Sequence, residues 1–238
     1  MKTVVLAFED QYYEELFTLI KRLRRDQGLA GMVLFGTSVR GTGGFINEVP
    51  KLLRIPPGQA SVLPDLVVCL ADADRPGNLL PGAADSPISD DGRALDEWVT
   101  QFEGAWREYL LTTARISPQD HVRVTTVCLR WSKESLLVAS PDVLLEHAAK
   151  RERRAEVQTI LDQCRPSPIG LADQEYSLRY RSPEDCLNQI FAAIEGRSYK
   201  KGRHDEDLLR DYISRDPGHR GRLLRRCPDL TRLLAVLT

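Results

Sequence analysis

The chain has few of the features that mark a secreted, membrane or zinc-binding protein. Its five cysteines include no C-x-x-C pair, so neither a disulfide framework nor a zinc site is indicated. The four histidines are scattered and give no support to a zinc site or a Ser-His-Asp arrangement. No apolar run approaches the roughly 20 residues that span a bilayer, and no basic segment precedes the short apolar run at the N-terminus. We therefore expect a cytoplasmic protein without a membrane partner.

The chain also lacks a strong excess of positive or negative charge, and it lacks the common nucleotide-binding motifs. The 33 basic and 34 acidic residues give a formal charge of −1, which excludes a simple polybasic binder. Acidic residues predominate before Lys150 and basic residues after it, which suits a metal site followed by a phosphate-contacting arm, or merely solvated helix faces. Neither a P-loop nor a G-x-G-x-x-G motif is present. The glycine-rich segment 41–44 is interpreted as a connector rather than a phosphate cradle.

What the sequence does contain is acidic residues at the ends of two apolar runs. Residues 3–8 lead directly into Glu9, and residues 65–71 lead directly into Asp72 and Asp74. Short runs rich in β-branched residues are typical of buried parallel strands, whose carboxyl ends hold the ligand site of an open α/β sheet. Side chains two residues apart in an extended chain point the same way. If the two strands are neighbours, three carboxylates converge, and such a cluster favours a divalent cation such as Mg²⁺.

Each acidic signal has a plainer interpretation that the sequence leaves open. Asp72 and Asp74 precede Arg-Pro-Gly at 75–77, so they could simply open a turn. Glu9 and Asp10 could serve only as acidic residues at the start of the next helix. Glu134, which follows a predicted strand, is either a further metal ligand or a first-turn helix acid.

Hydrophobic periodicity predicts an α/β fold with a mainly parallel sheet and flanking helices. Strands are predicted at 3–8, 32–35, 65–72 and 121–129, and the helices between them at 12–25, 45–53 and 91–110. Asp90 or Asp91 is the predicted cap of the last of these helices. The later part is predicted to be helical at 141–164, 183–195, 205–215 and 217–237, with a Pro/Gly turn region at 165–173. We accordingly expect an α/β domain over 1–140 and a helical extension over 141–238 that packs on it.

The order of an apolar strand with Glu9 and a later apolar strand with Asp72-x-Asp74 resembles the TOPRIM (topoisomerase–primase) domain. In that family a strand-end glutamate and an Asp-x-Asp pair hold Mg²⁺ for phosphodiester chemistry. Residues 133–141 resemble the Glu-Ala-Trp-Leu-Leu-Ala-Asp stretch of a small stand-alone TOPRIM-like branch of unknown function found among bacterial defence genes. That branch is similar to the nuclease half of overcoming-lysogenisation-defect proteins. Residues 199–201 and 224–230 are similar to its usual ending.

Three positions depart from the pattern of that branch. Asp10 stands where the family places glycine, Ser132 leaves Glu134 without the usual acidic partner, and Leu136 replaces the tryptophan. These departures affect the second metal position more than the first.

The resemblance implies a Mg²⁺-dependent nuclease (Mn²⁺ being the alternative ion) that cleaves DNA rather than RNA. It assigns Glu9, Asp72 and Asp74 to catalysis and metal binding, and Glu134 to the metal. Phosphate contacts are predicted for three lysines: Lys133, Lys200 and Lys201. The resemblance also implies a role in anti-phage defence beside an ATPase or another subunit, while the oligomeric state stays open.

Two other functions compete with this prediction. One is a non-catalytic TOPRIM-like module that binds a partner protein or nucleic acid, its second metal position lost with Ser132. The other is a doubly wound phosphatase. Such enzymes place a nucleophilic aspartate at the end of the first strand, where this chain has Glu9 followed by Asp10, which argues against it.

Overall fold

The computed structural model describes residues 1–56, 62–85, 92–130, 132–164 and 182–238. Four strands form one sheet in the order β2-β1-β3-β4, and every neighbouring pair is parallel. The strands are β1 (Lys2–Phe8), β2 (Met32–Ser38), β3 (Leu66–Asp72) and β4 (Val124–Leu129). The predicted α/β class with a parallel sheet is thus confirmed, and β1 and β3, which carry the acidic strand ends, are direct neighbours.

Each strand divides its side chains between two hydrophobic cores, one on each face of the sheet. In β1, Leu6 and Phe8 face one core while Val5 and Ala7 face the other. The buried cysteines Cys69 and Cys128 belong to the second core and pack there as small apolar side chains. Such burial on both faces explains why the strands appear in the sequence as continuous apolar runs rather than as alternating ones.

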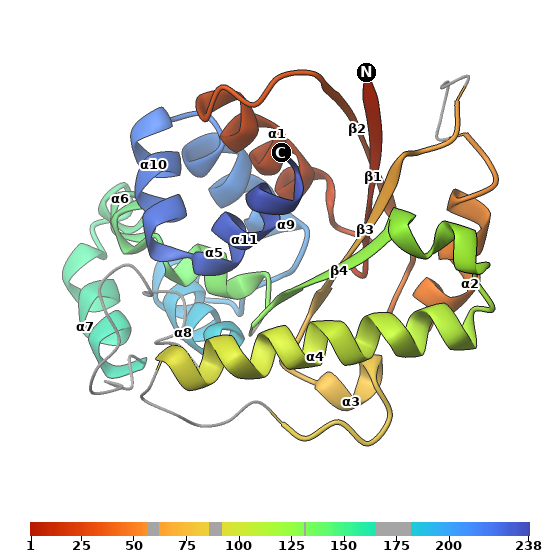
Figure 1. Cartoon of the computed structure of the whole chain (residues 1–238). Helices are drawn as coiled ribbons and strands as arrows, with labels where there is room; N and C mark the ends of the chain where they lie inside the picture. Colours follow the sequence, from red (N-terminus) through yellow and green to blue (C-terminus); the bar gives the residue numbers. More distant parts are fainter. Residues whose placement is uncertain (57–61, 86–91, 131, 165–181) are drawn as a thin grey trace.

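Helices cover both faces (Figure 1). The second core is covered by α2 (Gly44–Leu52), α3 (Pro76–Leu79) and the long α4 (Gly92–Thr113). The first core is covered by α1 (Glu14–Asp26) and by the C-terminal half of the chain. The described elements of that half are α5 (Glu134–Val138), α6 (Pro141–Ala149), α7 (Arg154–Cys164), α8 (Pro183–Glu195), α9 (Arg203–Asp205), the π-helix η3 (Glu206–Ile213), α10 (Pro217–Arg226) and α11 (Pro228–Val236).

Several element boundaries differ from the prediction. The helix predicted over 141–164 is broken after α6, where Glu152 adopts a left-handed φ of 59°. The one predicted over 217–237 is broken at Cys227, because Pro228 begins a new helix. Residues 118–123 form the 3₁₀ helix η1 rather than the start of β4. The predicted cap at Asp90 or Asp91 and the turn region 165–173 lie outside the described residues.

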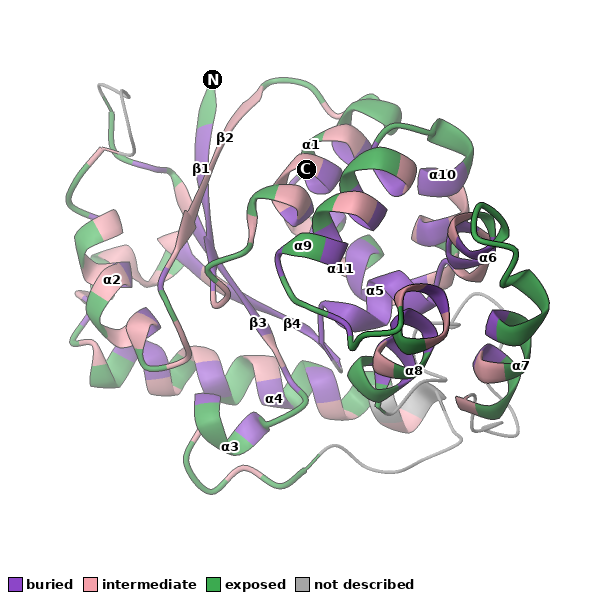
Figure 2. Cartoon of the chain, turned by 180° about the vertical axis from the view of Figure 1, so that it is seen from behind, coloured by how far each residue is buried: buried purple, intermediate pink, exposed green. Residues whose placement is uncertain are grey.

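The C-terminal helices share one core with the sheet. Figure 2 shows buried positions running from the strands into α5, α8 and α11, and the same hydrophobic cluster contains Val4 of β1 and Leu237 at the chain end. One hydrophobic core therefore contains residues from both sides of residue 140. The predicted division into two domains at that residue stays a prediction. Within the described residues, no helix has the length and apolar character needed to cross a membrane.

Candidate active site at the strand ends

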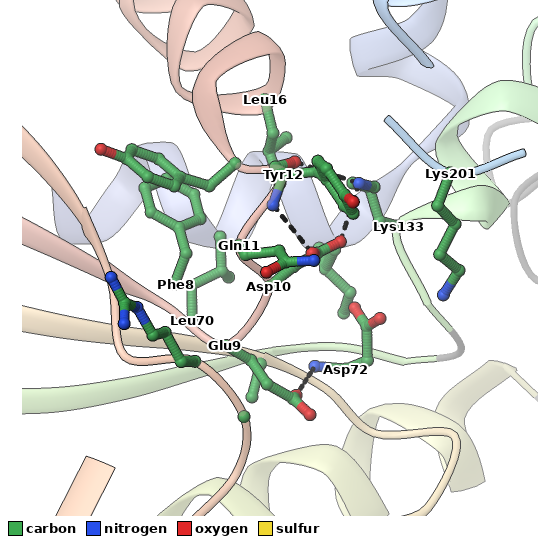
Figure 3. Close-up of a pocket in the computed structure, with 15 residues that line it drawn as sticks. Phe8, Glu9, Asp10, Gln11, Tyr12, Leu16, Leu70, Asp72, Lys133 and Lys201 are labelled. Atoms are coloured by element: carbon green, nitrogen blue, oxygen red, sulfur yellow. Dashed lines mark hydrogen bonds and ion pairs between the residues drawn. The ribbon is translucent and has the colours of Figure 1, made fainter. Parts of the chain in front are cut away.

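Glu9 is held rigidly just beyond β1. Its backbone N–H donates to the Leu70 carbonyl (3.1 Å), and its own carbonyl accepts from the Gly41 N–H (2.8 Å). The Glu9 side chain turns towards β3, where Oε2 accepts a hydrogen bond from the Asp72 N–H at 3.2 Å (Figure 3). The glycine-rich loop after β2 is thus tied to β1 by backbone hydrogen bonds, and it helps to position Glu9.

Asp72 and Asp74 stand at and just beyond the end of β3. Asp72 is the half-buried last residue of β3, and the next residue, Ala73, donates from its N–H to the Leu129 carbonyl (2.8 Å). The Ala73 side chain enters the core on the α4 face. Asp72 follows Val68 and Leu70 on the opposite face, and Asp74, in the bend after the strand, lines the same hollow as Glu134.

The acidic side chains repel one another. Burial raises the pKa of Glu9, and the charges of Asp74 and Asp10 raise it further, against the lowering effect of the hydrogen bond from Asp72. The pKa of Asp72 lies well above its usual range because of burial and the charges of Glu134, Glu9 and Asp74. The pKa of Asp74 is raised mainly by burial, while Arg75 and Lys201 lower it. A cation beside these groups would relieve the repulsion.

Glu134 is an acidic residue in the first turn of α5, one of the two roles predicted for it, while its role as a metal ligand stays a prediction. Its side chain is 1% exposed, and its charge raises the pKa of Asp72. Glu134 Oε1 lies 3.0 Å from Nζ of Lys201. Burial alone would lower the pKa of Lys201, but Glu134 and Asp72 raise it, so that the ammonium form is favoured beside the carboxylates.

The three predicted phosphate-binding lysines have different environments. Lys133 is only 4% exposed, and its Nζ contacts Asp10 (2.9 Å), Asp205 (2.7 Å) and the Tyr12 carbonyl (3.1 Å). These three acceptors match the three N–H donors of the Lys133 ammonium group, so the side chain links the segment after β1 to α9. Lys200 and Lys201 are exposed, and only Lys201 enters the acidic cluster.

The segment that carries Lys201 is anchored by buried groups. The Tyr199 hydroxyl donates to Asp205, the residue that also pairs with Lys133. His204 accepts from the Lys200 N–H (2.9 Å) and stacks on Phe191 with ring centroids 3.9 Å apart. Lys201 thus extends from a fixed backbone, although it lies far along the chain from the strand ends.

Three adjoining hollows surround this lysine. A cavity of about 450 Å³ is lined by Glu9 and Asp72 at its polar end and by several aromatic and leucine side chains. Two smaller hollows of about 200 and 180 Å³ lie beside Asp74 and Glu184. Lys201 lines all three.

Sequence reasoning missed several residues at this site. Arg40, which has a left-handed φ of 60°, and Tyr12 both line the large cavity. Asp205 supports Lys133 and Tyr199 from a distant part of the chain. The glycine-rich segment was the only sequence signal near Arg40, and nothing local marks Asp205. Asp10 accepts from the Tyr12 N–H (2.9 Å), so it forms a turn ahead of α1 rather than capping the helix itself.

The carboxylates suit a hard divalent cation in their chemistry but do not form a ready-made cage. Among the described residues, no three Asp, Glu, His or Cys side chains stand together as metal ligands. Mg²⁺ usually keeps several waters and takes only one or two carboxylates, together with substrate phosphates. Glu9 and Asp72 stand at the ends of neighbouring strands, where the Glu9 carboxylate accepts from the Asp72 backbone N–H, and they could supply that smaller number of carboxylates.

No family model, curated protein or solved structure matches this chain. The site must therefore be interpreted from its own geometry.

Proposed function

We propose that this protein is a Mg²⁺-dependent nuclease that hydrolyses phosphodiester bonds of DNA, with a TOPRIM-like arrangement of its acidic residues. The observation that carries the proposal is the hydrogen bond of the Glu9 carboxylate to the Asp72 backbone N–H at the ends of adjacent parallel strands, together with the raised pKa of Glu9, Asp72 and Asp74. Carboxylates that raise one another's pKa in a cleft are typical of functional sites.

Asp72, with Glu9 or Asp74, would hold the metal ion, which would activate water and neutralise charge on the phosphate. Glu134 is a weaker fourth ligand because it pairs with Lys201. Where Glu9 is not a ligand, its raised pKa suits it to accept a proton from the attacking water. The Lys201 ammonium lies where it could stabilise the negative charge that develops on the phosphate oxygens.

The test is cleavage of supercoiled plasmid with Mg²⁺ or Mn²⁺ by the wild type, Asp72→Ala and Asp162→Ala. Asp162 is an exposed aspartate on α7 and serves as the matched control. We expect the wild type and Asp162→Ala to nick or linearise the plasmid, and Asp72→Ala to be inactive. Absence of cutting with either metal, by protein that circular dichroism shows to be folded, would contradict the proposal.

The Lys201–Glu134 ion pair favours a second candidate, a non-catalytic module that binds a partner or nucleic acid. In that case Lys201 permanently neutralises the carboxylate that a second metal would need. The substitution Glu134→Gln separates the two functions. A nuclease that uses Glu134 loses cleavage, whereas a binding module retains its partner.

A place in bacterial anti-phage defence, beside an ATPase or another subunit, also belongs to this proposal. It rests on the resemblance of residues 133–141, 199–201 and 224–230 alone. Co-purification of the tagged protein from cells that carry its neighbouring genes tests it. Recovery of the protein without any such subunit would count against it.

A further inference from the structure

Building on the proposed nuclease function, we propose that the 450 Å³ cavity receives one unpaired nucleotide. The base would occupy the apolar half and the phosphate the polar end, beside Glu9 and Asp72. The preferred substrate is then DNA with an unpaired or flipped-out nucleotide rather than an uninterrupted duplex.

The inner wall of the cavity is apolar and aromatic. Phe8 and Tyr13 stack with ring centroids 5.0 Å apart and planes inclined by 22°. Leu16, Leu70 and Leu129 complete this wall. Phe8 and the three leucines are only 2–3% exposed, so the contact surface for a flat aromatic group is offered mainly by Tyr12 and Tyr13. A nucleobase gains burial and ring contacts on such aromatic side chains.

An exposed aromatic ring stands at the rim of the cavity. Tyr12 is 44% exposed, although large apolar rings are usually covered. It is nevertheless held in place, because its carbonyl accepts from Lys133 (3.1 Å) and its ring lies against Gly202 (Figure 3 shows it between Leu16 and Lys133). A Cβ at Gly202 would lie 2.9 Å from the Tyr12 ring carbons. A ring that is ordered yet open on its other side can stack on a base at little entropic cost.

The polar end is balanced in charge. Three carboxylates line the cavity (Glu9, Asp10 and Asp72), as do three cationic side chains (Arg40, Lys133 and Lys201). Asp10 and Lys133 pair with each other. The remaining groups are two carboxylates for a divalent cation, and for a phosphate group Arg40 together with Lys201, whose ion pair with Glu134 lies outside the cavity lining.

Size separates unpaired from paired nucleotides. A cavity of about 450 Å³ lies within the range of about 300–1,000 Å³ typical of small-molecule sites. A stacked base pair cannot enter it unless one base leaves the helix, which costs a few kcal/mol in a perfect duplex and least where the base is already unpaired.

Fluorescence anisotropy with the full-length protein tests this inference. The probes are a fully paired fluorescein-labelled DNA duplex, the same duplex with one bulged thymidine, and the same bulge with an abasic site. Ca²⁺ replaces Mg²⁺ so that binding is measured without turnover. We expect the bulged duplex to bind about tenfold more tightly than the other two, in line with the value of one base stacked on an aromatic ring.

Tyr12→Ala should abolish this preference and Tyr12→Phe should keep it. The control Tyr109→Ala, on α4 across the sheet, should behave as the wild type.

Equal binding of the three probes, or an unchanged preference in Tyr12→Ala, overturns the inference. A preference for the bulge that depends on Tyr12, in a protein that does not cut plasmid, supports nucleotide binding in the cavity and contradicts the proposed nuclease function. Metal-dependent cutting without any preference for the bulge supports the nuclease function and contradicts nucleotide binding in the cavity.

Discussion

The carboxyl group of Asp72 stands out among the individual residues, because burial and three neighbouring carboxylates raise its pKa well above the ordinary range. A folded carboxyl that binds its proton more tightly than the unfolded one makes stability fall as pH rises from the unfolded pKa (3.8) through the higher folded pKa. Without a metal ion, the charged form of Asp72 therefore costs the protein stability at neutral pH.

We expect Asp72→Asn, in the presence of EDTA at neutral pH, to stabilise the protein by on the order of 1 kcal/mol, a typical gain when functional strain is removed. Thermal denaturation should show a rise of roughly 2–4 °C. Near pH 4 the gain should vanish, because Asp72 then carries its proton in the folded protein. A stabilisation that is the same at both pH values would show that repulsion is not its cause.

Lys200 and Lys201 are adjacent in the chain but differ in their contacts, so substituting each tests whether position in the acidic cluster matters for cleavage. Lys201 pairs with Glu134 inside the acidic cluster, whereas Lys200 lies on the exposed surface. Lys201→Ala should lower cleavage by roughly 100-fold, a typical loss for one group that stabilises transition-state charge. Lys200→Ala should lower it by less than about threefold, the scale of a surface substitution. Plasmid nicking rates at low and moderate salt measure both, and equal losses would mean that these lysines act only as surface charges.

The site could be predicted from the sequence where local rules apply, and not beyond. The ends of the two apolar runs place Glu9 and Asp72 at neighbouring strand ends, where the Glu9 carboxylate accepts from the Asp72 N–H. That Asp72 and Asp74 serve one site stays a prediction. The pairing of Lys133 with Asp205 has no local signature, since it joins residues 72 positions apart in a way that only tertiary packing decides.

At the scale of single elements, the short segment before α9 decides where Lys201 lies. Gly202 has a left-handed φ of 83°, and its missing Cβ leaves room for the Tyr12 ring. Gly196, which ends α8, has a similar φ of 70° but no heavy atom within 4 Å of the position that a Cβ would take. A substitution at Gly196 thus introduces backbone strain alone, whereas one at Gly202 introduces backbone strain and a steric clash with Tyr12.

We expect Gly202→Ala and Gly196→Ala each to lose about 1–2 kcal/mol of stability, because alanine disfavours left-handed backbone. Gly202→Ala should lose more, since its methyl group must also displace Tyr12. Only Gly202→Ala should impair cleavage, because only this variant moves the backbone next to Lys201. Urea denaturation and nicking assays give both quantities, and equal behaviour of the two variants would contradict the packing role of Gly202.

Sequence patterns also predicted the elements unequally. The strands were found because they are buried on both faces and so form continuous apolar runs. The breaks after α6 and before α11 were missed, because apolar residues continue in helical spacing on both sides of each break. Pro228 was the one local signal for the second break, since proline at the first position of a helix starts a new one.

For the whole molecule, the question is whether residues 1–140 can fold without the remainder. The C-terminal helices supply much of the core on the α1 face, including Leu187, Ile190 and Leu230. Ion pairs and hydrogen bonds add to this. Arg220 pairs with Asp26 of α1 (2.5 Å), and the fully buried Arg130 donates to Asp229 of α11 (2.8 Å). Removal of either partner of such a buried pair leaves an uncompensated charge.

We therefore expect a fragment of residues 1–140 to lack fixed tertiary structure, with the near-ultraviolet circular dichroism of an unpacked core. Co-expression with residues 141–238 should restore a soluble, cooperatively unfolding complex, because the two pieces bury the same hydrophobic cluster. A fragment 1–140 that unfolds cooperatively on its own would instead make it an independent domain, with residues 141–238 an accessory to it. In that case the placement of Lys201 beside Glu134 would depend on how firmly the two parts dock, and cleavage by the fragment alone would measure how much the lysine contributes.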